Sequence, residues 1–142
     1  MKIKKILLYV IIFSISCFGT PILITQFVKI ANQNASDYIQ NFRPKTSSLP
    51  DGIYAGKYKA YKLFTMSKVK FKIKNGIILD ISINKLFHTP GSVYKDDIEN
   101  KIKQNKILDI NAITGATRTS NFAKAAIKNA IESKNIPNTN SF

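Results

Sequence analysis

The chain is poor in the residues that build metal and thiol sites, with one cysteine and one histidine among 142 residues. Cys17 lies inside an apolar run, which excludes a disulfide framework, a CxxC redox pair and a CxxCH haem site. With His88 as the sole histidine, a His/Cys metal cluster and a Cys/His catalytic pair are also excluded. These absences argue against a stand-alone enzyme that relies on its own catalytic side chains.

Acidic residues are also scarce, because 8 Asp and Glu stand against 22 Lys and Arg, for a formal charge of +14. The lysines alternate along expected strands and do not cluster around exposed aromatic residues, so we expect no nucleic-acid partner. The basic excess favours an anionic membrane surface, an acidic partner or an anionic cofactor. A solvated basic surface is the alternative.

The N-terminus predicts a membrane anchor over residues 1–28. Lys2, Lys4 and Lys5 precede a run from Ile6 to Val28 that contains no charged residue. As a helix at 1.5 Å per residue this run extends roughly 34 Å, enough for a hydrocarbon core of about 30 Å. The N-terminal lysines favour a cytoplasmic N-terminus. We therefore expect a single-pass protein of the cell membrane, with its domain facing the periplasm or cell exterior.

Two alternatives stay open for this segment. Ser14-Ile15-Ser16 is similar to a small-x-small cleavage site, which is typical of a removed signal peptide. Cys17 is a possible lipid attachment site, although Ser14 stands where a bulky aliphatic residue is usual.

The remainder divides by composition into three parts. Residues 29–50 are polar and end in a segment rich in Pro, Ser and Lys, which predicts a linker or stalk. Residues 51–134 carry the regular hydrophobic patterns of a compact domain, and we expect 135–142 to be a disordered tail.

Within the domain, strand patterns come first. Residues 53–61 read as a strand, and two further alternating segments flank Asn75-Gly76, a strong signal for a tight hairpin turn. The alternation predicts that one face of the hairpin is buried, with these residues pointing inward: Val69, Phe71, Ile73, Ile77, Leu79, Ile81 and Ile83.

Helical patterns follow the strands. Residues 92–106 predict a helix with Val93, Ile98 and Ile102 inward, and 107–110 a short strand. A second helix is expected after residue 118, with Thr119 or Ser120 as its N-cap and a single apolar stripe, while Lys124, Lys128 and Asn129 lie on the other side. Strands before helices indicate an α+β fold, a small antiparallel sheet packed with two or more helices and preceded by one N-terminal transmembrane helix.

The segment 111–120, which opens the second helix, is the strongest functional candidate. It is rich in hydroxyl groups, from Thr114, Thr117, Thr119 and Ser120, and Gly115 and Ala116 allow close approach of a ligand to the backbone. The start of a helix supplies unpaired N–H groups and the positive end of the dipole, which together suit a phosphate. On these grounds alone an ordinary capped loop is the alternative.

Taken in order, these pieces resemble the FMN-binding domain family over about residues 51–131. The resemblance rests on Asp51-Gly52-Ile53-Tyr54-Ala55-Gly56, the Asn75-Gly76 hairpin, Thr89-Pro90-Gly91 and Thr114-Gly115-Ala116-Thr117-x-Thr119-Ser120. Known members include the covalently flavinylated subunits of the Rnf and sodium-pumping NADH:quinone reductase complexes.

The resemblance implies that Thr117 is esterified to the phosphate of FMN by a flavin transferase that uses FAD. It further implies that Thr114, Thr119 and Ser120 donate hydrogen bonds to the phosphate, with Gly115 and Ala116 in the same turn. Thr89, Pro90 and Gly91 would then shape a turn that lines the isoalloxazine pocket. His88 stands where the family often has Glu, either near the flavin ring or as a surface histidine.

One departure bears on the modification. The family motif usually begins with Asp six residues before the acceptor, and Asn111 occupies that position here. From the resemblance and the predicted anchor, the first interpretation is a membrane-anchored electron carrier with covalent FMN, which exchanges electrons with a membrane redox complex or other carriers. The alternatives are a non-covalent FMN-binding module, or an envelope interaction protein with a degenerate flavin site.

Overall fold

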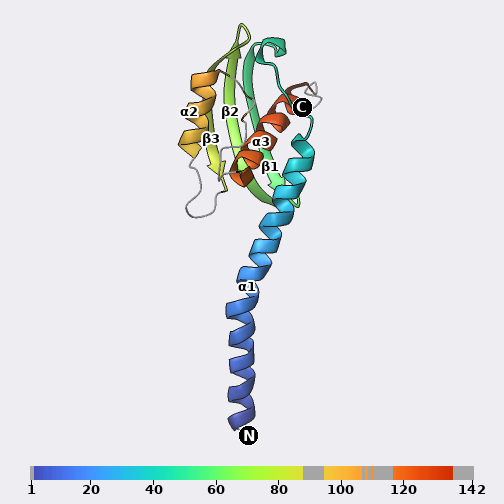
Figure 1. The fold of residues 1–142 in the computed structure, drawn as a ribbon, viewed down its shortest axis with the longest axis vertical. Helices are drawn as coiled ribbons and strands as arrows, with labels where there is room; N and C mark the ends of the chain where they lie inside the picture. The colour runs from blue at the N-terminus through green and yellow to red at the C-terminus, as the bar shows by residue number, and fades with distance from the viewer. Residues whose placement is uncertain (1, 88–94, 107, 109, 111–116, 136–142) are drawn as a thin grey trace, which may run out of the picture.

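The computed structural model describes residues 2–87, 95–106, 108, 110 and 117–135, with side chains described from residue 20 to residue 134 within these ranges (Figure 1). The elements in chain order are α1 (Lys2–Ile39), a short 3-10 helix η1 (Thr46–Ser48), β1 (Gly52–Ala60), β2 (Phe64–Lys74), β3 (Ile77–Leu86), α2 (Lys95–Asn105) and α3 (Thr117–Asn135). The predicted tail lies outside this description apart from Asn135. From residue 20 on, where side chains are described, no helix has the length and apolar character that a membrane span requires.

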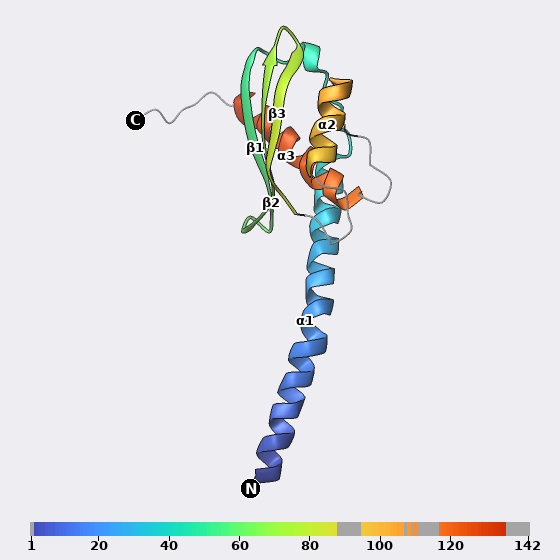
Figure 2. The same cartoon turned by 90° about the vertical axis from the view of Figure 1, so that its left-hand side faces the viewer.

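The α+β class is confirmed by a three-stranded antiparallel sheet in the order β1-β2-β3, with the helices gathered on one of its faces (Figure 2). The hairpin turn is where the sequence predicts it. Asn75 and Gly76 adopt φ angles of 52° and 71°, which place both in the left-handed region that a tight turn of this type needs.

The inward face of β3 departs from simple alternation. Ile78, Ile81 and Ile83 are buried, whereas Ile77 and Leu79, which we expected inward, are 46% and 54% exposed. The cause is a bulge, since Lys72 pairs with Asp80 while the next residue, Ile73, pairs with Ile78. The extra residue in β3 reverses the side-chain alternation at that point.

The main core lies between the inner sheet face and helices α2 and α3. The rings of Tyr54 and Phe71 stack there with centroids 5.0 Å apart. Ile98 and Ile102 of α2 point into this core as predicted. Residues 107–110 are expected as a strand, but the two described there, Leu108 and Ile110, lie in no regular element although both are buried.

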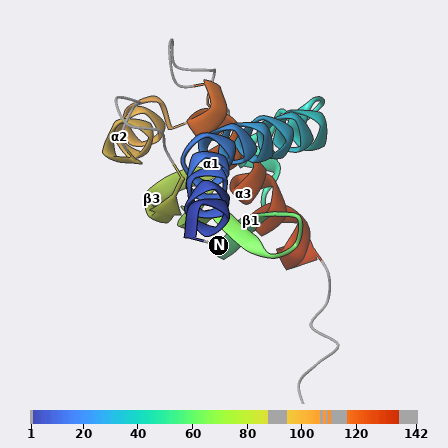
Figure 3. The same cartoon turned by 90° about the horizontal axis from the view of Figure 1, so that it is seen from below.

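Helix α3 is buried on two sides, which corrects the expectation of one apolar stripe. Ala126 and Ile127 face the main core, while Phe122 and Ala125 belong to a second cluster shared with α1. Lys124, expected on a wet side, is only 7% exposed. α1 covers this side of α3, as the view from below shows (Figure 3).

The first part of the predicted linker is also helical. α1 continues without interruption to Ile39, and Ala31 and Ala35 are fully buried against the domain. Small residues at four-residue spacing form a flat stripe on which α3 packs closely. The segment 29–39 is therefore part of the packed structure and not a free stalk. Its polar composition gave no indication of this tertiary contact.

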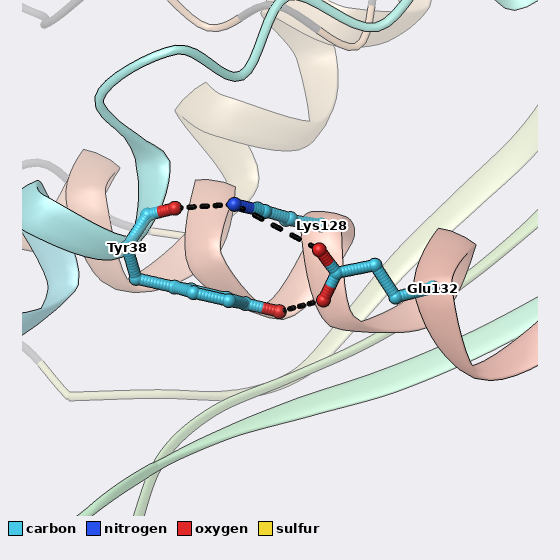
Figure 4. Close-up of polar contacts among 3 residues, drawn as sticks. All are labelled: Tyr38, Lys128 and Glu132. Atoms are coloured by element: carbon cyan, nitrogen blue, oxygen red, sulfur yellow. Dashed lines mark hydrogen bonds and ion pairs between the residues drawn. The ribbon is translucent and has the colours of Figure 1, made fainter.

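Three side chains join α1 to α3 (Figure 4). The Tyr38 hydroxyl donates a hydrogen bond to the Glu132 carboxylate, and the Lys128 ammonium donates to the Tyr38 carbonyl oxygen at 2.5 Å. The same ammonium lies 4.3 Å from the centre of the Tyr38 ring and 3.7 Å from the Glu132 carboxylate. Burial raises the pKa of the Tyr38 hydroxyl, and the hydrogen bond to Glu132 and its negative charge raise it further.

We expect this contact to weaken at high pH. Above the ordinary pKa of 10.0 the unfolded chain releases the Tyr38 proton, while the folded protein keeps it. The Tyr38 hydroxyl therefore contributes fully to the free energy of unfolding below pH 10, and this contribution falls as the pH rises above 10. Tyr38→Phe should cost about 1 kcal/mol at pH 8. Urea unfolding of both proteins between pH 8 and pH 11 measures this difference, which should shrink above pH 10. A constant difference would mean that the hydroxyl does not couple to Glu132.

Candidate functional site

The predicted hydroxyl turn leads into the first turn of α3. Thr117 is the first helical residue, so Thr119 and Ser120 lie inside α3 and the expectation that one of them is its N-cap is wrong. Thr117 and Arg118 are exposed, whereas Thr119 and Ser120 are 2% and 1% exposed. The N–H groups of this turn have no partner within the helix, and the helix dipole is positive there.

Ser120 carries a second sign of a ligand site. Its hydroxyl oxygen is buried and has no hydrogen-bond partner in the described structure. A buried hydroxyl without a partner costs about 1–3 kcal/mol, so it needs an explanation, and a bound ligand that supplies the partner is one. Ser67 of β2 has the same property. Ser67 pairs with Tyr58 across the sheet, and Tyr58 packs beside α3.

The end of β3 meets the start of α3. Phe87 follows β3 directly, and its ring contacts that of Phe122 edge-on with centroids 6.3 Å apart. Its backbone N–H donates to the Met66 carbonyl oxygen at 2.7 Å. Phe87 directly precedes the predicted segment 88–91, and α3 directly follows the predicted segment 114–116. The contact between Phe87 and Phe122 therefore joins the residues next to one segment to the helix that follows the other.

Aromatic rings form the base of this region. The ring of Tyr58 stacks on Phe122 at 5.9 Å with an interplanar angle of 17°, and Phe87 stays 36% exposed. The Tyr58 hydroxyl donates to the Ala31 carbonyl oxygen of α1, and burial raises its pKa, with a smaller contribution from Tyr61. A planar ligand would find an exposed ring in Phe87. Sequence reasoning missed these three aromatics, although Phe87 directly precedes the predicted His88 segment.

α1 also reaches the site. The Asn121 side-chain amide of α3 donates to the side-chain oxygen of Asn32 at 3.1 Å. The site region therefore combines the first turns of α3, the end of β3 and the C-terminal part of α1.

Most of the remaining predicted site residues lie outside the described part of the chain. They are His88, Thr89, Pro90, Gly91, Thr114, Gly115 and Ala116, and Asn111 is among them. Three cavities lined by described residues have volumes of about 260, 400 and 240 Å³. They lie beside Gly56 and Asn129, around residues 41–49, and on the outer sheet face near Lys70, so none includes a predicted cofactor-binding residue.

Fold and site together define a small α+β domain in which the start of α3 lies beside an exposed aromatic ring. Comparison with protein families identifies it: residues 65–132 match the FMN-binding domain family. The match agrees with the sequence resemblance and indicates a flavin-binding domain in this part of the chain. The match runs from β2 into α3, and it leaves out residues 51–64, which the sequence resemblance included. Searches of curated proteins and of solved structures returned no match.

The described residues fit the phosphate end of FMN. A phosphate needs several convergent donors, and the first turn of α3 offers backbone N–H groups, the exposed Thr117 hydroxyl and the unpartnered Ser120 hydroxyl. The Arg118 side chain is exposed next to them and adds positive charge.

Proposed function

We propose that the protein is a membrane-anchored electron carrier of the cell envelope, with FMN bound through a phosphoester to the Thr117 oxygen. FMN binding follows from the family, and the proposal adds the covalent bond, the anchor and the relay of electrons. The observation that carries it is the exposed Thr117 hydroxyl at the first position of α3, next to the buried and unpartnered Ser120 hydroxyl.

The attachment chemistry suits this position. A flavin transferase would direct the Thr117 hydroxyl oxygen onto the FMN phosphorus of FAD. A new P–O bond forms, the phosphoanhydride bond to AMP breaks, and the hydroxyl proton goes to a base while AMP leaves. An exposed hydroxyl at a helix start is accessible to a second protein, and the unpaired N–H groups nearby stabilise the phosphodiester charge. Ser120 and Thr119 would hold the phosphate from the inner side.

The anchor is supported by the N-terminal sequence. No charged residue occurs from Ile6 to Val28, and α1 is helical through this run. Near its end Ile22, Leu23 and Ile24 are 62%, 70% and 62% exposed, which is costly in water and favourable in lipid. The N-terminal lysines support an orientation with the domain outside the cytoplasmic membrane.

The relay of electrons is supported by what this chain offers for chemistry. Bound FMN supplies one- and two-electron redox chemistry, and the protein contributes position and electrostatics. With one histidine, and one cysteine inside the apolar run, the chain has little with which to transform a substrate of its own. A donor and an acceptor, such as a membrane redox complex and another carrier, are therefore part of the proposal.

Asn111 favours a second candidate function, a module that binds FMN without a covalent bond. If the carboxylate usual at this position assists the transferase, an amide in its place would slow the attachment. The N–H and hydroxyl groups at the start of α3 would hold the FMN phosphate with or without a covalent bond. A third candidate, an envelope interaction protein with a degenerate flavin site, predicts no bound flavin.

Mass spectrometry separates these candidates. The full chain is produced together with a matching flavin transferase, purified, denatured and digested. An FMN adduct on the peptide that contains Thr117 supports the covalent carrier. Yellow colour that is lost on denaturation supports the non-covalent module, and a colourless protein in both states would overturn flavin binding altogether.

A further inference from the structure

The turn between β1 and β2 exposes large apolar side chains to an unusual degree. Residues Tyr61, Lys62, Leu63 and Phe64 form this hairpin tip. The exposed fractions are 45% for Tyr61, 76% for Leu63 and 57% for Phe64. Such residues are usually withdrawn from water or replaced by polar turn residues, so the hairpin tip leaves an unusual amount of apolar surface exposed.

The backbone of the hairpin tip is also unfavourable for large side chains. Tyr61 and Lys62 have φ angles of 53° and 60°, and the turn closes with the Leu63 N–H donating to the Ala60 carbonyl oxygen at 3.1 Å. Asn and Gly adopt these angles readily, as at Asn75-Gly76, whereas a bulky residue is strained there. The hairpin tip thus keeps large side chains at a cost in stability, which is typical of segments with a function.

The hairpin tip lies beside α1 at the end of its apolar run. The Phe27 ring of α1 packs on Tyr61 at 4.9 Å and edge-on against Phe64 at 5.3 Å. Phe27 immediately precedes Val28, the last residue before Lys29. The turn lies at the end of the domain from which the rest of α1 extends, whereas the β2–β3 turn lies at the opposite end (Figures 1 and 2).

We propose that the hairpin tip inserts into the interfacial region of an anionic lipid bilayer, the same bilayer that holds α1. The proposal rests on the membrane anchor proposed above. At the level where α1 would leave the hydrocarbon, Tyr61 and Phe64 have the amphipathic or aromatic character of an interfacial belt, and Leu63 adds buried apolar area. Lys62 and Lys29 are exposed at this level and attract anionic headgroups.

Two points of contact would fix how the domain stands on the membrane. α1 alone permits rotation about its axis, and a second contact at the hairpin tip removes that freedom. The start of α3 lies at the same end of the domain, because Ala60, Met66 and Phe122 share one buried cluster. The flavin site is then held close to the bilayer surface, which favours redox partners that are themselves in the membrane.

The absence of tryptophan from the chain allows a direct test. Single tryptophans are placed in the full chain at Leu63, at Leu79 and at Ile22, and each variant is reconstituted into phosphatidylcholine–phosphatidylglycerol vesicles. Leu79 is the matched control, an exposed leucine in the same sheet near the opposite turn, at 54% exposure. Ile22 reports the anchor. The readout is the ratio of tryptophan emission in vesicles with ordinary and with brominated acyl chains.

We expect L63W to be quenched at least twofold by brominated lipid and to emit at shorter wavelength than L79W, which should stay unquenched. Quenching of I22W with equal emission from L63W and L79W would leave the anchor standing and overturn the proposal for the hairpin tip. A blue-shifted but unquenched L63W would also overturn it, in favour of a protein partner such as a second copy. An unquenched I22W would overturn the anchor and the hairpin-tip contact together.

Discussion

Replacement of Thr117 by valine is expected to abolish covalent flavin on this protein. Valine keeps the shape of threonine but substitutes a methyl group for the oxygen that would bond to phosphorus. Thr117 is exposed at the first position of α3, so the fold should not change. After co-production with a flavin transferase, in-gel flavin fluorescence and the mass of the denatured chain measure the adduct.

Thr117→Ser is the matched control, because it restores the hydroxyl group and should restore part or all of the adduct. Circular dichroism and urea unfolding of both variants should match those of the parent protein. An undiminished adduct in Thr117→Val would show that another hydroxyl is the acceptor. Loss of the adduct in Thr117→Val and its return in Thr117→Ser would separate the chemical role of the oxygen from any effect on folding.

Replacement of Gly56 by alanine is expected to have the largest effect on stability. A Cβ at this position would lie 2.3 Å from the Ala126 carbonyl oxygen and 2.4 Å from the Ala130 backbone nitrogen. Both are backbone atoms of α3, which is packed from the other side by α1 and cannot shift as a flexible side chain would. We expect a loss of about 3 kcal/mol or more in the free energy of unfolding, measured by urea denaturation.

Two controls sharpen this measurement. Ala55→Val adds volume to the neighbouring residue, which is exposed, and should change stability by less than about 0.5 kcal/mol. Adding Ala130→Gly to the Gly56→Ala variant removes the side-chain contact at 2.6 Å but leaves both backbone contacts. Only a small recovery is therefore expected. A Gly56→Ala protein as stable as the parent would mean that β1 and α3 are further apart than described.

The features that the sequence predicted well are those coded by neighbouring residues. The Asn75-Gly76 turn is local, because both residues tolerate the positive φ angles that the hairpin needs. Ile98 and Ile102 lie on one face of α2 because their four-residue spacing matches the helical period. The helix that follows this segment was predicted for the same reason, from apolar residues at three- and four-residue spacing, and α3 is found there.

The features that it predicted less well depend on partners far away in the chain. The inward face of β3 reverses at a bulge, which is set by pairing with β2. Lys124 is buried because α1 covers a side of α3 that amphipathic patterning assigned to solvent. The aromatic base of the site, with Tyr58, Phe87 and Phe122, joins residues from three separate parts of the chain.

By itself the sequence determined the α+β class, the hairpin and the match to the FMN-binding domain family, since turn chemistry, periodicity and a short ordered motif all act over a few residues. Only the tertiary structure decided that residues 29–39 are packed helix, that Ser120 lies buried with an unpartnered hydroxyl, and that an apolar turn stands beside Phe27. These outcomes depend on which surfaces exclude water from one another, and that is settled only when distant segments meet.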